Sequence, residues 1–90
     1  MFLLQFHNPD KGCIKTDSID LLVKCLEYMT FDSLAFPGHL ARGTILYTLK
    51  MAEPFLPKQI YISNSPMYDR VDDYLKTLGY TISGAVWIRK

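Results

Sequence analysis

The clearest pattern of apolar and polar positions lies in the last third of the chain. Residues 59–63 are mostly β-branched or aromatic, which predicts a short strand. Ser65-Pro66 then supplies an N-cap followed by proline at the first helical position. Apolar residues recur at helical spacing up to Gly79, which stands where a helix ends in a left-handed residue. The pattern predicts a strand, a helix and a last strand over residues 80 to about 89.

The first third of the chain predicts one strand and one helix. Residues 2–6 are apolar apart from Gln5, which favours a strand buried on both faces, and the turn formers at residues 8–12 end it. A helix follows with Thr16 or Asp17 as its N-cap and a broad apolar stripe as far as Met29. So broad a stripe indicates burial against more than one neighbour.

The middle of the chain is less regular. Residues 31–36 form a possible strand that Asp32 and Ser33 interrupt, and Pro37-Gly38 marks a turn. A second helix is expected from about His39 or Arg42 to Ala52, because prolines follow it. Taken together, residues 1–90 predict a single compact α/β domain, with a mixed sheet of about four strands covered by about three helices.

Charge and composition exclude several classes of function. Ten basic and nine acidic side chains give a net charge of +1, so we expect no nucleic-acid partner. No apolar run is long enough to cross a membrane and nothing resembles a signal peptide, which predicts a cytoplasmic protein. The two cysteines, Cys13 and Cys25, are expected to be reduced thiols. With His7 and His39 they offer a zinc site, but the close ligand pairs of such sites are absent, and the alternative is a small buried Cys25.

Residues 38–44 are the best candidate for binding an anion. Small residues and Arg42 precede a helix there, and a helix N-terminus presents unpaired backbone N–H groups and a positive dipole end. Phosphate and pyrophosphate bind to such an arrangement. The alternative is an ordinary helix start with a solvent-facing arginine.

Residues 36–90 also resemble the GCN5-related N-acetyltransferase family. The segment GHLARGTILYTL enters a helix, the strand QIYIS follows, a second helix ends in YLKTLGY, and the last strand closes in VWIRK. In that family a glycine-containing loop after the fourth strand holds the pyrophosphate of acetyl-CoA through backbone amides, and Gly43 matches its last small residue. The resemblance implies transfer of an acetyl group from acetyl-CoA to an amine. It implies that the residues holding the cofactor are Leu40, Ala41, Arg42, Gly43, Thr44 and Asn64.

Acetyl transfer needs an acid for the leaving thiolate and a base for the incoming amine. The resemblance implies Tyr74 or Tyr68 as the acid, with Tyr80 also near that part of the chain, although Leu75 occupies the position where the family usually has its tyrosine. His39 or Glu53 is the candidate base, acting through water. The alternative for each tyrosine is an amphipathic residue at the edge of the core.

A second hypothesis is a small non-enzymatic protein that binds and inhibits another protein, such as an immunity protein or a phage-encoded modulator. Its positive sign is the 13% aromatic content, because tyrosine, tryptophan and arginine are favoured at interfaces. The residues expected at such contacts are Tyr47, Tyr61, Tyr68, Trp87 and Arg89. The last strand, with Trp87 and Arg89, is also expected to pair with its own copy in a homodimer if it is an open edge, whereas Trp87 is otherwise a core residue.

Overall fold

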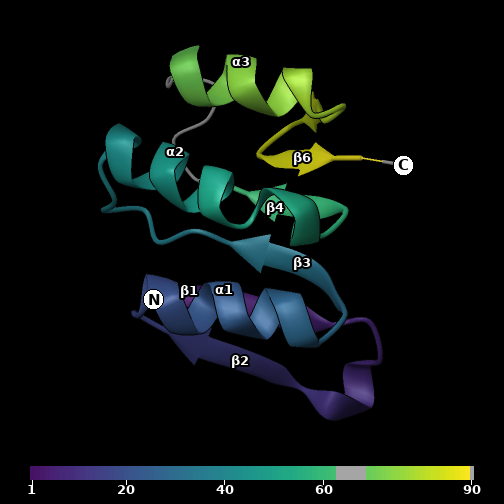
Figure 1. Ribbon diagram of the computed structural model, residues 1–90. Coiled ribbons are helices and arrows are strands. Elements are labelled where there is room, and N and C mark those ends of the chain that lie inside the picture. The colour runs from purple at the N-terminus through teal and green to yellow at the C-terminus, as the bar shows by residue number, and fades with distance from the viewer. Residues whose placement is uncertain (63–68, 90) are drawn as a thin grey trace.

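Figure 1 shows the computed structural model of the protein, in which residues 1–62 and 69–89 are described. One mixed sheet of six strands has the order β2-β1-β3-β4-β6-β5. The strands are β1 (Phe2–Phe6), β2 (Cys13–Thr16), β3 (Phe31–Ala35), β4 (Gln59–Tyr61), β5 (Thr81–Ser83) and β6 (Val86–Ile88). The helices are α1 (Ile19–Tyr28), α2 (Arg42–Met51) and α3 (Asp69–Thr77), with 3-10 turns η1 (Pro9–Lys11) and η2 (Glu53–Phe55).

Four of the six strands run in one direction. β3 and β4 are parallel neighbours, β2 is parallel to β3 because both are antiparallel to β1, and β5 is parallel to β4 because both are antiparallel to β6. The helices α1, α2 and α3 connect these four strands in chain order. Since such crossovers have one hand and all three advance across the sheet in the same sense, the three helices lie on one face (Figure 1).

The core lies between that face and the helices. Paired strand residues share a face, and one row across the sheet points toward the helices. This row consists of Ile14, Leu4, Leu34, Ile60, Trp87 and Ile82. Its four central members are completely buried. Each such side chain stabilises the fold by about 1.5–3 kcal/mol relative to an exposed one.

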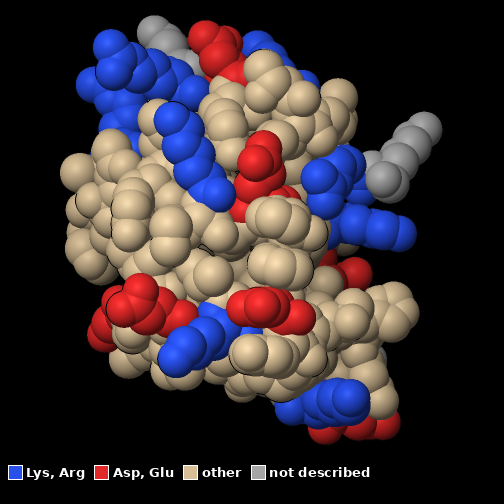
Figure 2. All heavy atoms as spheres, viewed as in Figure 1, with Lys and Arg blue, Asp and Glu red and all other residues tan. Residues whose placement is uncertain are grey.

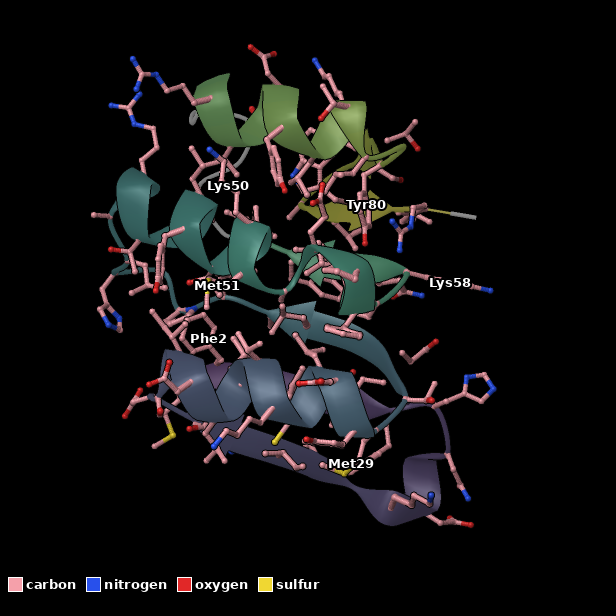
Figure 3. The ribbon with its side chains drawn as sticks, viewed as in Figure 1. Phe2, Met29, Lys50, Met51, Lys58 and Tyr80 are labelled. Atoms are coloured by element: carbon pink, nitrogen blue, oxygen red, sulfur yellow. The ribbon has the colours of Figure 1, made fainter. Side chains whose placement is uncertain are left out.

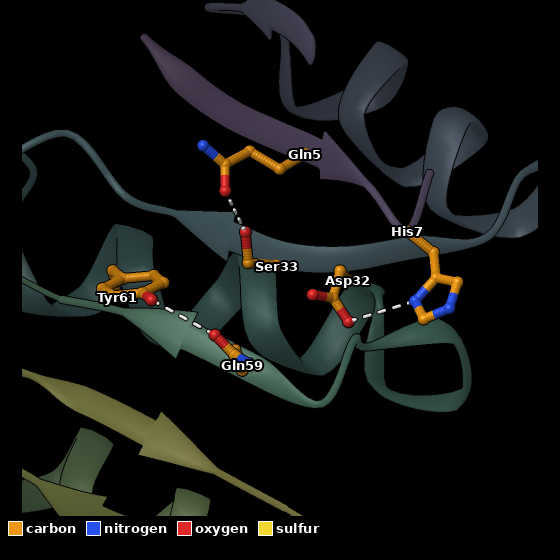
Figure 4. Close-up of polar contacts among 6 residues, drawn as sticks. All are labelled: Gln5, His7, Asp32, Ser33, Gln59 and Tyr61. Carbon is orange, nitrogen blue, oxygen red and sulfur yellow. Dashed lines mark hydrogen bonds and ion pairs between the residues drawn. The ribbon is translucent and has the colours of Figure 1, made fainter. Parts of the chain in front are cut away.

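No helix in the described part of the chain covers the opposite face of the sheet. The neighbouring row there holds Gln5, Ser33 and Gln59, and Figure 4 shows their contacts. The Ser33 hydroxyl donates to Gln5 Oε1 at 3.1 Å, and the Tyr61 hydroxyl donates to Gln59 Oε1 at 3.2 Å. These pairs satisfy the polar side chains along the middle of the helix-free face.

The helix α1 begins slightly later than the sequence predicted. Ser18 is the N-cap of α1, and its hydroxyl accepts a hydrogen bond from the Leu21 amide at 3.2 Å. The prediction of Thr16 or Asp17 was therefore wrong by one or two positions. Thr16 belongs to β2, and its hydroxyl accepts a hydrogen bond from the Ser18 amide.

Among the helices that the structure describes, none is long and apolar enough to cross a bilayer.

The α/β class, the single mixed sheet and the three helices were predicted, but the sheet has six strands instead of about four. Residues 13–16 were not predicted as a strand, and they pair with β1 at the edge of the sheet. The predicted last strand is a hairpin of β5 and β6, turned at Gly84 with a φ of +64°. Ser65-Pro66, the predicted start of the last helix, lies outside the described residues.

The C-terminal strand is interior to the sheet. β6 pairs with β4 on one side and β5 on the other, and Trp87 is completely buried. The Arg89 amide donates to the Lys58 carbonyl at 2.8 Å, and its guanidinium lies 4.8 Å from the Tyr80 ring centroid. β6 is therefore not an open edge and Trp87 is a core residue, the alternative that the sequence offered, while the edge strand of the hairpin is β5.

Candidate functional site

The candidate site lies at the carboxyl ends of the parallel strands β3 and β4. Each strand is followed by a segment that leads into a helix, α2 after β3 and α3 after β4. Because the two strands are parallel, both helices begin at the same end of the sheet (Figure 1). Helix N-termini at this end present unpaired backbone N–H groups, which are suited to binding an anion.

The first turn of α2 leaves backbone donors available. Ala41 is its N-cap and provides no side-chain hydrogen bond to the helix. The amides of Thr44 and Ile45 donate to the Ala41 carbonyl at 3.0 and 3.1 Å. No described residue accepts a hydrogen bond from the preceding amides, those of Arg42 and Gly43. This helix start therefore has the free donors and the positive dipole end that bind anions.

Gly43 keeps the surface above this turn open. A Cβ at Gly43 would meet no atom within 4 Å, and its φ is not in the left-handed region. Neither packing nor backbone conformation within the described chain requires a glycine here. A missing side chain at this point lets a ligand approach the helix backbone closely.

A hollow of about 340 Å³ lies between the first turns of α2 and α3. It is lined by Arg42, Gly43 and Leu46 of α2 and by Arg70 of α3. Figure 2 shows Lys and Arg side chains gathered over these two helix ends, at the upper left. Both arginines are exposed, and neither forms an ion pair within residues 1–62 and 69–89. Two arginines therefore line one small hollow beside the amides of Arg42 and Gly43.

Arg70 was not predicted as a site residue. Its type and its place in an amphipathic helix are typical of a solvated surface. The signal that identifies it is topological: two helices that follow adjacent parallel strands must begin side by side. The side chain of Leu40, in contrast, is partly buried against the core, so only its backbone faces the predicted loop. Asn64 and Tyr68 lie outside the described residues.

Tyr74 lies one helical turn beyond Arg70, on the side of α3 that faces α2. The Lys50 ammonium is 5.9 Å from the centroid of the Tyr74 ring, and Figure 3 shows Lys50 between the two helices. Burial raises the pKa of Tyr74, and a hydrogen bond to Glu53 and the charge of Glu53 raise it further. The phenol consequently keeps its proton at neutral pH. Tyr74 and Glu53 are thus brought together, whereas His39 is an exposed residue of the loop before α2.

The other candidate residues, the cysteines and possible metal ligands, do not form a site among the described residues. Cys13 is exposed on the edge strand and Cys25 is buried in α1, as predicted for a small hydrophobic side chain. Within the described ranges, no three His, Cys, Asp or Glu residues are placed to hold a metal ion. The hollow between α2 and α3 is therefore the place where predicted site residues and available donors coincide.

The acetyltransferase resemblance stays a prediction that rests on the sequence segments quoted above. No protein-family model matches the chain, and no curated protein and no solved structure matches it either.

Proposed function

We propose that the protein binds acetyl-CoA in the hollow between α2 and α3 and transfers the acetyl group to an amine. The observation that carries the proposal is the meeting of two helix starts, Arg42 and Arg70 beside the open Gly43. The alternative is a pair of arginines that are only solvated. The coincidence argues against it, because backbone N–H donors, the positive end of the helix dipole and the two arginines all favour a negatively charged ligand.

A pyrophosphate suits this arrangement better than a single carboxylate. Guanidinium groups bind phosphate oxygens through two parallel hydrogen bonds, and Arg42 and Arg70 approach the hollow from different helices. The amides of Arg42 and Gly43 add donors that point along α2 toward the same space. In this proposal the two arginines clamp the phosphates, and the backbone of α2 fixes their position.

Tyr74 of α3 and Glu53, which follows the C-terminal end of α2, supply the proton chemistry of acetyl transfer in this proposal. The amine nitrogen forms a bond to the thioester carbonyl carbon while the carbon–sulfur bond breaks, so the sulfur needs a proton and the amine must lose one. Tyr74 holds a proton at neutral pH and donates it to the sulfur. Glu53, beside Tyr74, accepts the proton of the amine through water. The transfer is direct and requires no covalent cysteine.

The experiment that tests cofactor binding is thermal unfolding with and without acetyl-CoA. A ligand at about 100 times its dissociation constant raises the free energy of unfolding by roughly 2.7 kcal/mol, which is several degrees for a domain of this size. Gly43→Trp fills the open space over α2 and should abolish the shift, whereas Tyr47→Trp, at an exposed position of the same helix, should retain it. No shift at millimolar acetyl-CoA would rule out the proposal.

A second candidate function is protein binding without catalysis, and the helix-free face of the sheet favours it. Tyr61 and Ile88 are exposed large side chains on that face, and the central positions beside them, Gln5, Ser33 and Gln59, are uncharged. Depletion of charge with an exposed aromatic side chain is typical of interface cores. A photo-crosslinking residue in place of Tyr61 should capture one partner of constant mass, whereas the same residue in place of Tyr47, on a helix, should not.

A further inference from the structure

A larger groove lies at the opposite end of the sheet from the proposed cofactor site. Its volume is about 580 Å³, and it runs between the C-terminal end of α1 and the segment formed by η2 and the start of β4. Its floor is apolar and includes Leu26, Phe31, Leu56 and Pro57. None of the residues that line the groove also lines the α2–α3 hollow. The two surfaces are therefore separate.

Three large apolar side chains are exposed at this groove. Met29 and Phe55 are each 39% exposed, and Tyr28, the last residue of α1, is 78% exposed. The exposed Tyr28 protrudes beside a hollow that has apolar side chains in its lining. One patch therefore contains both an aromatic side chain and a hollow able to receive one. A surface that carries both parts of a contact is complementary to its own copy, as an isologous dimer requires.

The charges at the groove show the same self-complementarity. Glu27 lies on the α1 side and Lys58 on the β4 side, both exposed. Neither belongs to an ion pair in the described part of the chain, whereas His7 and Asp32, also at the groove, are 3.5 Å apart and pair with each other (Figure 4). Figure 3 shows Lys58 extended away from the ribbon and Met29 lower in the view, at the end of α1. Arg89 also lines the groove, but its guanidinium donates to the Leu56 carbonyl at 3.2 Å and lies over the Tyr80 ring. The side chains of Glu27 and Lys58 have no such partner among the described residues, and they lie on opposite sides of the groove.

We propose that this groove is the interface of a homodimer whose two-fold axis runs along it. Rotation about that axis places the α1 side of one protomer against the β4 side of its partner. Tyr28 of each protomer then enters the groove of the other, and Glu27 meets Lys58 of the partner subunit. A second copy fits better than an unrelated ligand, because the patch carries Glu27 and Lys58 on its two sides and combines a protruding aromatic side chain with a hollow. The proposal is independent of acetyl-CoA binding.

The first test measures molar mass by sedimentation equilibrium over a concentration series. The wild-type mass should rise toward twice that of one chain, and a chain that remains monomeric at millimolar concentration would overturn the proposal. Tyr28→Ser should raise the dimer dissociation constant at least about tenfold, because both protomers lose a central aromatic contact. Tyr47→Ser removes another exposed tyrosine side chain, outside the groove, and should leave the dissociation constant unchanged. Far-ultraviolet circular dichroism confirms that both variants are folded.

The second test reverses the two charges in separate chains. Glu27→Lys and Lys58→Glu should each weaken the homodimer, because like charges then face each other at both ends of the interface. Mixing the two variants should produce a heterodimer of wild-type affinity, since every Glu27–Lys58 contact again joins opposite charges. If the mixture associates no better than either variant alone, the two sides of the groove do not face each other and the proposed axis is wrong.

Discussion

The two ends of the one sheet differ in chemistry because the parallel strands β2, β3, β4 and β5 give every helix the same direction. At the carboxyl ends of the strands, helices begin, backbone N–H groups point outward, and Arg42 and Arg70 line a small hollow. At the opposite end helices finish, and the groove is lined by apolar and aromatic side chains with charges of both signs. Strand direction thus separates an end suited to an anionic ligand from an end suited to a protein surface.

Both ends of the sheet depend on the same core, so Leu34→Ala should weaken the ligand site and the dimer together. Leu34 is completely buried in the central strand β3, so its truncation should cost about 2–5 kcal/mol of unfolding free energy. Chemical denaturation measures that loss, and the acetyl-CoA shift and the dimer should weaken together. Leu21→Ala is the matched control: Leu21 is 49% exposed, and a change of less than about 0.5 kcal/mol is expected there.

Replacing both Arg42 and Arg70 by alanine should weaken ligand binding at one end of the sheet and leave the other end unchanged. Hydrogen bonds to charged groups contribute about 1.5–3 kcal/mol each, so the double variant should bind acetyl-CoA at least about a hundredfold more weakly. Isothermal titration calorimetry measures this, and sedimentation should find the dimer unchanged. Lys76→Ala removes one positive charge from the last turn of the same helix, outside the hollow, and should retain binding. An equal loss in that control would mean that net charge, not the hollow, attracts the ligand.

Tyr80→Phe should weaken the anchoring of the C-terminal strand at the groove end. The Tyr80 hydroxyl donates to the Pro57 carbonyl in a buried position, so its removal should cost about 1–2 kcal/mol. Burial raises the pKa of Tyr80 above its ordinary value of 10.0, and the Arg89 charge opposes that shift in part. The contribution of the neutral phenol is thus complete below pH 10 and lost as pH rises through the higher native pKa.

Alkaline denaturation followed by circular dichroism tests this dependence. The wild-type protein should lose stability above pH 10, and Tyr80→Phe should lose less over the same range because one of the groups with a raised pKa is gone. Tyr74→Phe is the matched control: Tyr74 also has a raised pKa but is less buried, so its replacement should change the alkaline profile less. An alkaline profile that is identical in the Tyr80 variant would contradict the assignment.

The smallest expected effect is a gain of stability. Gly43→Ala should raise the free energy of unfolding by up to about 1 kcal/mol, because alanine favours a helix and nothing obstructs its Cβ. The same variant should bind acetyl-CoA more weakly, since the methyl group occupies the approach to the α2 backbone. Gly79→Ala should instead be destabilising, because Gly79 has a φ of +92°. Thermal unfolding with and without the ligand separates the two effects.

Local signals in the sequence predicted the three helices and the strand β4 well. Apolar residues at helical spacing and a left-handed glycine depend on neighbours a few positions away, so they can be recognised without the fold. The strands β2 and β3 depend on partners far along the chain. Ser33 resembles a strand breaker until Gln5, 28 positions earlier, is seen to accept its hydrogen bond. Trp87 was uncertain for the same reason, because a last strand looks like an edge until β5 is found outside it.

The candidate site was predictable in part. Residues 40–44 were identified because a glycine and an arginine at a helix start are a local pattern, and Tyr74 because of its place in a resembling segment. Arg70 was missed because its role depends on the direction of two strands and not on its own neighbours. The groove with Tyr28 and Phe55 was also missed, since apolar residues at helix ends look like ordinary core residues until their exposure is known.

The position of β6 has a consequence for synthesis on the ribosome. Val86–Ile88 lies between β4 and β5, so the inner part of the sheet is filled by the last strand of the described chain to be translated. Until that strand emerges, β4 exposes an unpaired edge and the core lacks Trp87. Stable folding of this domain must therefore wait until residues 86–88 have been made, and a nascent chain arrested before residue 86 should remain sensitive to protease.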